Sequence, residues 1–437
     1  MPADPLATAD ELADHDRAGI DRPGGAGLLR RIAVDLSPLR ESPPFRRLFF
    51  GQSISLLAGE ITWIAVPYQM YHLTHSTLQV GLLYLATLVP LLVAPIAGGA
   101  IADAVDRRRL LLASELGFAL VSVALAVNAA LPHPKVWALY ALDAVGTTAF
   151  GFGTPSLRSL LPRIVREEKI AAASALEGLY SNFAAVGGPA AGGLVIAAIG
   201  LTGTYLVDVA SFAASLASIW LLPPLPAAPD ADRAGLRSVF EGFRYVRTQP
   251  VVLGIFLVDT NAMIFGMPMA LFPAIGEHFG GGSKTVGFLF AAPYAGALAG
   301  SIVSGWVGHV RRQGLGVVVA AAAWGAALIA FGYASTLWLA LLMLAVAGAA
   351  DFVSAVLRST IVLTATPDAM RGRVSGIEFT QVASAPTLGN LEAGVVASVT
   401  SPRFSIVSGG VACIAGCAAL ALAIPQLLRY DAKAQRT

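Results

Sequence analysis

Long apolar stretches separated by short polar segments are the main pattern of this chain. About 20 residues, each rising about 1.5 Å, cross a hydrocarbon core about 30 Å thick. We therefore predict twelve membrane spans, near residues 47–72, 78–102, 109–131, 136–160, 170–198, 203–222, 251–276, 285–308, 315–333, 337–363, 374–399 and 404–428. Backbone groups in lipid must bond within their own segment, so the spans should be helices. The pattern predicts an all-α membrane protein.

The composition agrees with this class and excludes several others. Of the 437 residues, 56% are hydrophobic and 13% are charged, whereas about a quarter of a soluble domain is charged. The sequence has no phosphate-binding loop of the GxxxxGK[ST] type, no nucleophile–His–acid arrangement and no histidines or cysteines at zinc spacing. We therefore expect neither an enzyme nor a cofactor, a metal site or a nucleic-acid partner.

The basic residues predict the orientation in the membrane. If both termini are cytoplasmic, most of the 29 Lys and Arg residues fall in the tails and in cytoplasmic loops. The loop residues are Arg107, Arg108, Arg109, Arg163, Arg166, Lys169, Arg311, Arg312, Arg371 and Arg373. Lys135, Lys284 and Arg403 would lie outside. This asymmetry follows the positive-inside rule and predicts a multi-pass membrane protein with both termini in the cytoplasm.

The chain divides into two halves. We predict a disordered cytoplasmic tail over 1–44, six-helix halves over 45–222 and 250–429, a linker over 223–249 and a tail over 430–437. The segments "SLRSLL" and "SALEG" of the first half return as "VLRSTI" and "SGIEF" about 200 residues later, which indicates pseudo-symmetric halves.

The linker has its own pattern. It opens with "PPLPAAPD", which cannot continue a helix. In "LRSVFEGFRYVR", Val239, Phe243 and Val246 alternate at helical spacing with arginines. We predict an amphipathic helix on the cytoplasmic surface; the alternative is a plain linker.

The loop after the second span, "GGAIADAVDRRRL", resembles the cytoplasmic-loop signature of the major facilitator superfamily. Gly99, Asp103, Arg107 and Arg108 match, and Asp106 stands where a second glycine is more usual. The resemblance implies the major facilitator fold and an acidic–basic cluster that holds the halves together when the cavity faces outward. The alternative is an ordinary basic loop. The second half has His309 where the acid would be. We therefore expect the acidic–basic cluster of that half to hold the halves together less strongly.

Longer stretches narrow the similarity. "FRRLFFGQ", "VPYQMYHLTHSTLQVGL", "VNAALPHP" and "TPDAMRGRVSGI" resemble the enterobactin exporter branch of this superfamily. The branch implies a proton-driven exporter of a siderophore or another bulky secreted metabolite in the bacterial inner membrane. We expect a monomer whose partners are a small molecule, protons and the lipid bilayer. A multidrug or macrolide-type efflux pump is the alternative, and a proton-coupled importer is a further one.

Carboxyls inside the spans are the first functional candidates, because ionisable groups in a membrane are costly. Glu60, Asp259, Asp143 and Asp351 lie in predicted spans, and desolvation favours the protonated form of such a group. We expect these four to couple proton movement to transport; the alternative is a structural role. Glu177 and Glu378 are expected to pair with loop arginines. Asp208 and Glu392 have no predicted role.

Two arginines and several polar residues are candidates for the substrate cavity. Arg158 and Arg358 could pair with Asp143 and Asp351, reach the cytoplasmic interface, or face the cavity and attract an acidic substrate. The polar candidates are Tyr68, Gln69, Tyr71, Tyr180, Asn182 and Asn261. Their alternative is hydrogen bonding between helices.

The segment "VGGPAAGG" carries a further resemblance. Gly188, Pro189, Gly192 and Gly193 match the G-P-x-x-G-G core of the antiporter signature. The resemblance implies that a stripe through Gly188 and Gly192 packs against the opposite half. The second half has only "TLGNLEAG" there, so we expect the feature to be one-sided. The alternative is general small-residue packing.

Overall fold

The computed structural model describes residues 35–223 and 236–432, except for the side chains at 100, 102, 103, 158, 159 and 236–240. Most of the predicted tail, 1–34, therefore lies outside the described residues. So do 224–235 of the linker and the last five residues of the chain.

The first half is built of long helices. They are α3 (Ser37–Glu41), α4 (Pro43–Thr74), α5 (Thr77–Ala104), α6 (Arg107–Ala130), α7 (Val136–Ile164), the short 3-10 helix η1 (Glu167–Lys169) and α8 (Ile170–Trp220). Within α8, Gly200 has φ 70° and ψ 177°, a conformation that only glycine adopts readily. Gly200 therefore divides α8 into two spans that run in opposite directions.

The second half follows α9 (Leu236–Thr248). It comprises α10 (Pro250–Phe265), η2 (Met269–Leu271), α11 (Phe272–His278), α12 (Gly282–Ile302), η3 (Ser304–His309), α13 (Gln313–Gly332), α14 (Leu337–Ala365), α15 (Asp368–Val399), α16 (Pro402–Ala423) and α17 (Pro425–Arg429). Together α10 and α11 form one interrupted span.

The predicted fold class is confirmed. In the described part of the chain, nine segments are long and apolar enough to cross a membrane. One of them is α8, which supplies two spans, and α7, with 29 residues, and α15, with 32, are also long enough to span a membrane. These helices account for the twelve predicted spans.

Two predicted spans differ in detail. The span expected over 285–308 ends as α12 at Ile302 and continues as η3. The span expected over 251–276 is interrupted after Phe265, where Pro268 cannot donate a backbone hydrogen bond. The backbone N–H of Ala270 donates instead to Oδ1 of Asn390 on α15, at 2.8 Å, so a side chain satisfies the interrupted backbone.

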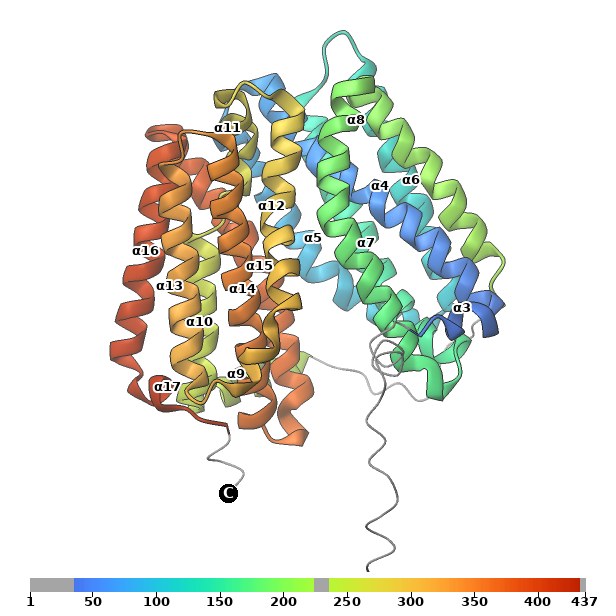
Figure 1. Ribbon diagram of the computed structural model, residues 1–437. Coiled ribbons are helices and arrows are strands. Elements are labelled where there is room, and N and C mark those ends of the chain that lie inside the picture. The colour runs from blue at the N-terminus through green and yellow to red at the C-terminus, as the bar shows by residue number, and fades with distance from the viewer. Residues whose placement is uncertain (1–34, 224–235, 433–437) are drawn as a thin grey trace, which may run out of the picture.

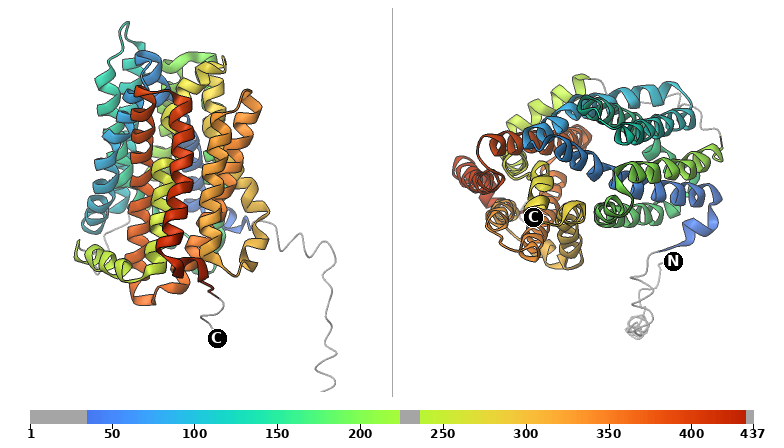
Figure 2. Two further views of the ribbon diagram at one scale, coloured as in Figure 1. Left: turned by 90° about the vertical axis from the view of Figure 1, so that its left-hand side faces the viewer. Right: turned by 90° about the horizontal axis from the view of Figure 1, so that it is seen from above.

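The two halves form separate bundles that converge at one end and diverge toward the other (Figure 1). The diverging end carries α3, α9 and α17, and we call it the linker face. The converging end carries α11 and the start of α12, and we call it the opposite face. Seen along the bundle axis, the halves lie side by side (Figure 2).

The helix α9 confirms the predicted helix in the linker. Arg373 of α15 forms an ion pair with Glu241 of α9 at 3.1 Å, and the Tyr245 hydroxyl donates to the carbonyl of Ala365 at 3.3 Å. Val246 is buried, whereas Phe243 is 54% exposed. The helix therefore rests on the second half through Val246 and the polar contacts.

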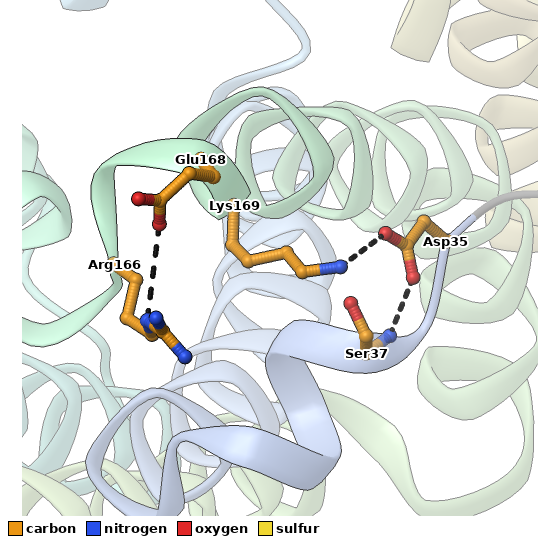
Figure 3. A network of polar contacts seen from close by, with 5 residues as sticks. All are labelled: Asp35, Ser37, Arg166, Glu168 and Lys169. Carbon is orange, nitrogen blue, oxygen red and sulfur yellow. Dashed lines mark hydrogen bonds and ion pairs between the residues drawn. The ribbon is translucent and has the colours of Figure 1, made fainter.

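The expectation of a disordered segment is wrong for residues 37–41, which form α3. The Ser42 hydroxyl caps α4 and also donates to the carbonyl of Ile164 at 2.6 Å. Before α3, Asp35 accepts from the backbone N–H of Ser37 at 2.8 Å and pairs with Lys169 at 3.1 Å (Figure 3). These contacts attach the start of the first half to the end of α7 and to η1.

The attachment of α3 should depend on acid. The hydrogen bonds from Ser37, and then Lys169, lower the pKa of Asp35 to about 2. Because the native pKa is lower than the unfolded one, the stabilisation is complete above about pH 4 and is lost as the pH falls toward about 2. We expect faster amide hydrogen exchange at Ser37 across that range. Asp35→Asn should remove this pH dependence, and an unchanged profile in the variant would contradict the assignment.

Candidate functional site

A buried ion pair lies in the second half. Arg358 of α14 pairs with Oδ1 of Asp259 of α10, and Gln381 of α15 donates to the other carboxylate oxygen at 2.9 Å. Arg358 is 8% exposed and Asp259 is 4% exposed. Three helices are thus joined by one charge pair, which a low-dielectric interior strengthens.

This pair corrects three expectations. Arg358 does not reach the cytoplasmic interface, its partner is Asp259 rather than Asp351, and its charge is neutralised before any substrate binds. Glu378, expected to pair with a loop arginine, lies instead in the electrostatic field of Arg358. The loop residue Arg373 pairs with Glu241. The side chain of Arg158 is outside the described part.

A pocket adjoins the ion pair in the second half. Its lining residues are Asp259, Ala262, Met263, Met267, Ala321, Trp324, Asp351 and Ser354. Two predicted coupling carboxyls, on α10 and α14, therefore face the same small space. Trp324 is held there by its indole N–H, which donates to the carbonyl of Gly266 at 3.1 Å.

Two tyrosines, one in each half, lie in the electrostatic field of the candidate carboxyls. Tyr294 of α12 lies in the electrostatic field of Glu60 and Asp351. Tyr84 of α5 lies in that of Asp143 and of Tyr294. These five groups come from five helices, α4, α5, α7, α12 and α14, a grouping that sequence spacing alone would not have indicated.

Glu60 of α4 packs closely against Gly188 of α8. It is partly buried, and a Cβ added at Gly188 of α8 would lie 3.3 Å from its Cγ. Gly192 likewise faces Ile61 and Ile64 of α4. The stripe through Gly188 and Gly192 therefore packs within the first half, and the expectation that it contacts the opposite half is wrong.

Contact between the halves depends on the next glycine. Gly193 of α8 lies against Gly287 of α12, where an added Cβ on Gly287 would be 2.9 Å from the Cα of Gly193. The Ser283 hydroxyl donates to the carbonyl of Gly193 at 3.0 Å. The backbones meet at the opposite face because neither position carries a side chain.

A second contact repeats this geometry between α5 and α15. An added Cβ on Gly81 would lie 3.3 Å from the Cα of Gly394, and the Thr77 hydroxyl donates to the carbonyl of Gly394 at 3.1 Å. Each contact joins a hydroxyl residue and a glycine one turn later to a glycine of the other half. The expectation of a one-sided feature is therefore wrong. We call the two contacts the glycine contacts.

A contact between His75 and Glu277 also joins the halves at the opposite face. His75, in the left-handed conformation at the end of α4, lies with Nδ1 3.8 Å from Oε1 of Glu277 on α11. The His72 ring stacks on Tyr68 with centroids 6.0 Å apart. Tyr68, a predicted cavity residue, thus belongs to the aromatic cover of this face.

The remaining polar candidates have different positions. Gln69 is 1% exposed and accepts from the Tyr205 hydroxyl at 2.7 Å, and Asn261 donates to the carbonyl of Cys413 at 2.8 Å. Both hold helices together. Asn182 is exposed on α8 and remains available to a ligand.

The loop signature lies at the linker face of the first half. Asp106 caps α6 by accepting from the N–H groups of Arg108 and Arg109. Arg108 donates to the carbonyl of Trp220 and lies over its ring, 5.4 Å from the centroid. An added Cβ at Gly99 would meet nothing within 4 Å. The Asp103 side chain lies outside the description, so its pairing stays a prediction.

Sequence reasoning missed several of these residues. It left out Gln381, Tyr84 and Tyr294. It also left out Glu115 of α6, which accepts from Gln52 of α4 at 3.2 Å, and gave no role to Asp208 of α8, which accepts from Thr62 at 2.8 Å. A polar residue in a span is the available signal for each, but its partners lie on distant helices.

Three comparisons with known proteins agree with this architecture. The family model described as transmembrane secretion effector matches residues 33–436. The enterobactin exporter EntS of Shigella boydii serotype 18 is 30% identical over 397 residues, which are 91% of this chain and 95% of that protein.

Solved structures resemble the fold at lower identity. A bacterial homolog of the human lysosomal transporter Spinster, inward-facing and unoccupied, has a TM-score of 0.64 at 15% identity, covering 92% of this chain and 98% of that one. A bacterial homologue of the iron transporter ferroportin, inward-facing, has a TM-score of 0.68 at 14% identity, covering 89% and 99%.

Proposed function

Because the chain belongs to the transmembrane secretion effector family of major facilitator transporters, and not to an enzyme family, we propose that it is a proton-coupled secondary exporter. Its substrate is a siderophore or a similar bulky secreted metabolite. The observation that carries this proposal is that the carboxyls Glu60, Asp143, Asp259 and Asp351 lie within membrane-spanning helices of both halves.

We place the linker face in the cytoplasm, with both termini on that side of a bacterial inner membrane. The basic loop residues support this orientation, since Arg108, Lys169 and Arg373 all lie at helix ends of the linker face. The protein would then be closed toward the outside by the glycine contacts and by His75–Glu277. That arrangement is an inward-facing state, in which a substrate enters from the cytoplasm. We expect a monomer to carry out the cycle.

Coupling needs groups whose charge changes during the cycle. A carboxyl that gains a proton from outside loses its charge and with it the cost of burial between the closed halves. Glu60 lies in the first half and Asp351 in the second, so protonation of both carboxyls favours return to the inward-facing state. Release of the proton to the cytoplasm favours substrate binding and reopening.

The enterobactin exporter relative supports the siderophore class, since the similarity extends over nearly the whole of both chains. A drug efflux pump remains the second candidate on one observation. Described carboxyls occur in the spans of both halves, while the buried Arg358 is already paired with Asp259. An interior with more acidic than available basic groups favours a lipophilic cation as substrate.

Proteoliposomes loaded with enterobactin or with a cationic macrolide distinguish the two. Transport of enterobactin driven by a pH gradient supports the siderophore class, and transport of the macrolide alone supports the drug class. Movement of neither probe in response to a gradient contradicts the coupling.

Glu60→Gln should abolish the dependence of transport on the pH gradient, because glutamine keeps the size of the side chain but cannot exchange a proton. Transport is measured in proteoliposomes with and without the gradient. Glu168→Gln, at an exposed carboxyl that pairs with Arg166 at 3.8 Å, should behave like the unmodified protein. Full gradient dependence in Glu60→Gln would remove Glu60 from the mechanism.

A further inference from the structure

Three sets of hydrogen bonds connect one face of α4 to the second span of α8 and to α6, away from the candidate site. We call them the polar ladder. Its bonds are Tyr205–Gln69 (2.7 Å), Thr62–Asp208 (2.8 Å), Ser122–Asp208 (2.7 Å), Gln52–Ser215 (2.8 Å) and Gln52–Glu115 (3.2 Å).

The polar ladder runs along α4, because its three α4 residues lie at successive levels of that helix. Thr62 lies about two helical turns from Gln69 and about three turns from Gln52, so all three share one face. At about 1.5 Å per residue, the Asp208 and Glu115 levels are about 15 Å apart along α4. The Glu115 level is nearer the linker face, where α6 begins at Arg107.

The two carboxyls of the ladder are buried with neutral partners. Asp208 is 2% exposed and Glu115 is 8% exposed. One oxygen of each accepts from hydroxyl or amide groups, while Oδ1 of Asp208 and Oε2 of Glu115 have no hydrogen-bond partner. In the part of the chain that the structure describes, neither carboxyl takes part in an ion pair.

The surrounding charges do not compensate these groups. Glu115 of α6 lies in the electrostatic field of Asp208 of α8. Tyr205 of α8 lies in the field of Asp208 and of Asp143 on α7. The α4 side chains in the ladder are neutral: Gln52, Thr62 and Gln69. A charge buried without a partner costs several kcal/mol, whereas a proton on the unpaired oxygen removes that cost.

We propose that Asp208 and Glu115 are two exchangeable proton-binding sites of the first half, separate from the substrate cavity. The proposal rests on proton-coupled export and adds two proton-binding residues of this half to Glu60 and Asp143. Because the Asp208 and Glu115 levels join α4, α6 and α8, a change in proton occupancy alters the contacts by which these helices hold one another.

A purely structural role predicts something different. Asparagine and glutamine keep the shape and can accept the same hydroxyl and amide hydrogen bonds. If the carboxyls only hold helices together, these replacements preserve the pH dependence of the protein. If they exchange protons, the replacements remove a titration.

Infrared spectroscopy of the full chain in lipid vesicles tests proton exchange without any substrate. We expect two protonated-carboxyl bands that respond to pH, one lost in Asp208→Asn and the other in Glu115→Gln. Ser122→Ala should shift the first band without removing it. Asp208→Glu should retain a titrating carboxyl band. That result would show that the band is lost in Asp208→Asn because the carboxyl is removed, and not because the protein fails to fold. Both variants keeping every titrating band of the unmodified protein would overturn the proposal.

Transport separates this proposal from the function on which it rests. In enterobactin-loaded proteoliposomes, Asp208→Asn should lose gradient-driven transport but keep exchange at equal pH on both sides. Gradient-driven transport equal to that of the unmodified protein in both variants would also overturn the role of the ladder. If the unmodified protein ignores the gradient, the proposed function fails, and the infrared bands still decide whether the two carboxyls exchange protons.

Discussion

Gly287→Leu should hold the two halves apart at the opposite face. Any Cβ at this position would lie 2.9 Å from the Cα of Gly193, and backbone cannot move aside as a flexible side chain can. Overpacking of this kind costs about 1–3 kcal/mol. At about 1.4 kcal/mol per factor of ten, the ratio of closed to open molecules falls by about 5- to 150-fold, and transport falls with it.

Spin labels at exposed Lys135 and Lys284, one in each half, report the closure as a distance distribution. Gly81→Leu should widen the distribution in the same way, because Gly81 meets Gly394 in the equivalent contact. Gly178→Leu is the control, since an added Cβ there meets nothing within 4 Å. A distribution in Gly287→Leu identical to that of the unmodified protein would contradict the role of the glycine contacts.

Arg358→Leu and Asp259→Leu should each destabilise the second half by about 3–5 kcal/mol, because each leaves an uncompensated buried charge. The double replacement should cost much less than the sum, since two leucines leave no charge behind. Thermal unfolding in one detergent measures the three variants.

The exposed pair Arg371–Asp368, at 2.7 Å, provides the matched control. Its side chains are 44% and 88% exposed, and such pairs contribute about 0–1 kcal/mol. Additive effects of the two buried replacements would show that Arg358 and Asp259 do not stabilise one another.

The resemblance and the glycine motif illustrate how far sequence reasoning extends into the site. It selected Gly188 to Gly193 as a packing element, and each glycine of that group that matches the motif does pack closely. It assigned the wrong partners, because the face that a helix presents depends on its rotation in the bundle. A sequence that is apolar on all sides contains little information about that rotation.

For the candidate carboxyls as well, the sequence indicated the residues but not their partners. Glu60, Asp143, Asp259 and Asp351 were recognisable because a charged group in an apolar span is rare. Their partners were not recognisable. Gln381, which binds Asp259, lies on α15, more than a hundred residues away in the chain.

The sequence by itself determined the spans, the two halves and the helix in the linker, because local hydropathy and helical spacing decide what can cross or lie on a membrane. Only the tertiary structure decided that Arg358 pairs with Asp259, that Gly193 and Gly394 make equivalent contacts, and that Glu115 and Asp208 lie in one ladder. The physical reason is that these relations depend on the rotation and depth at which distant helices pack.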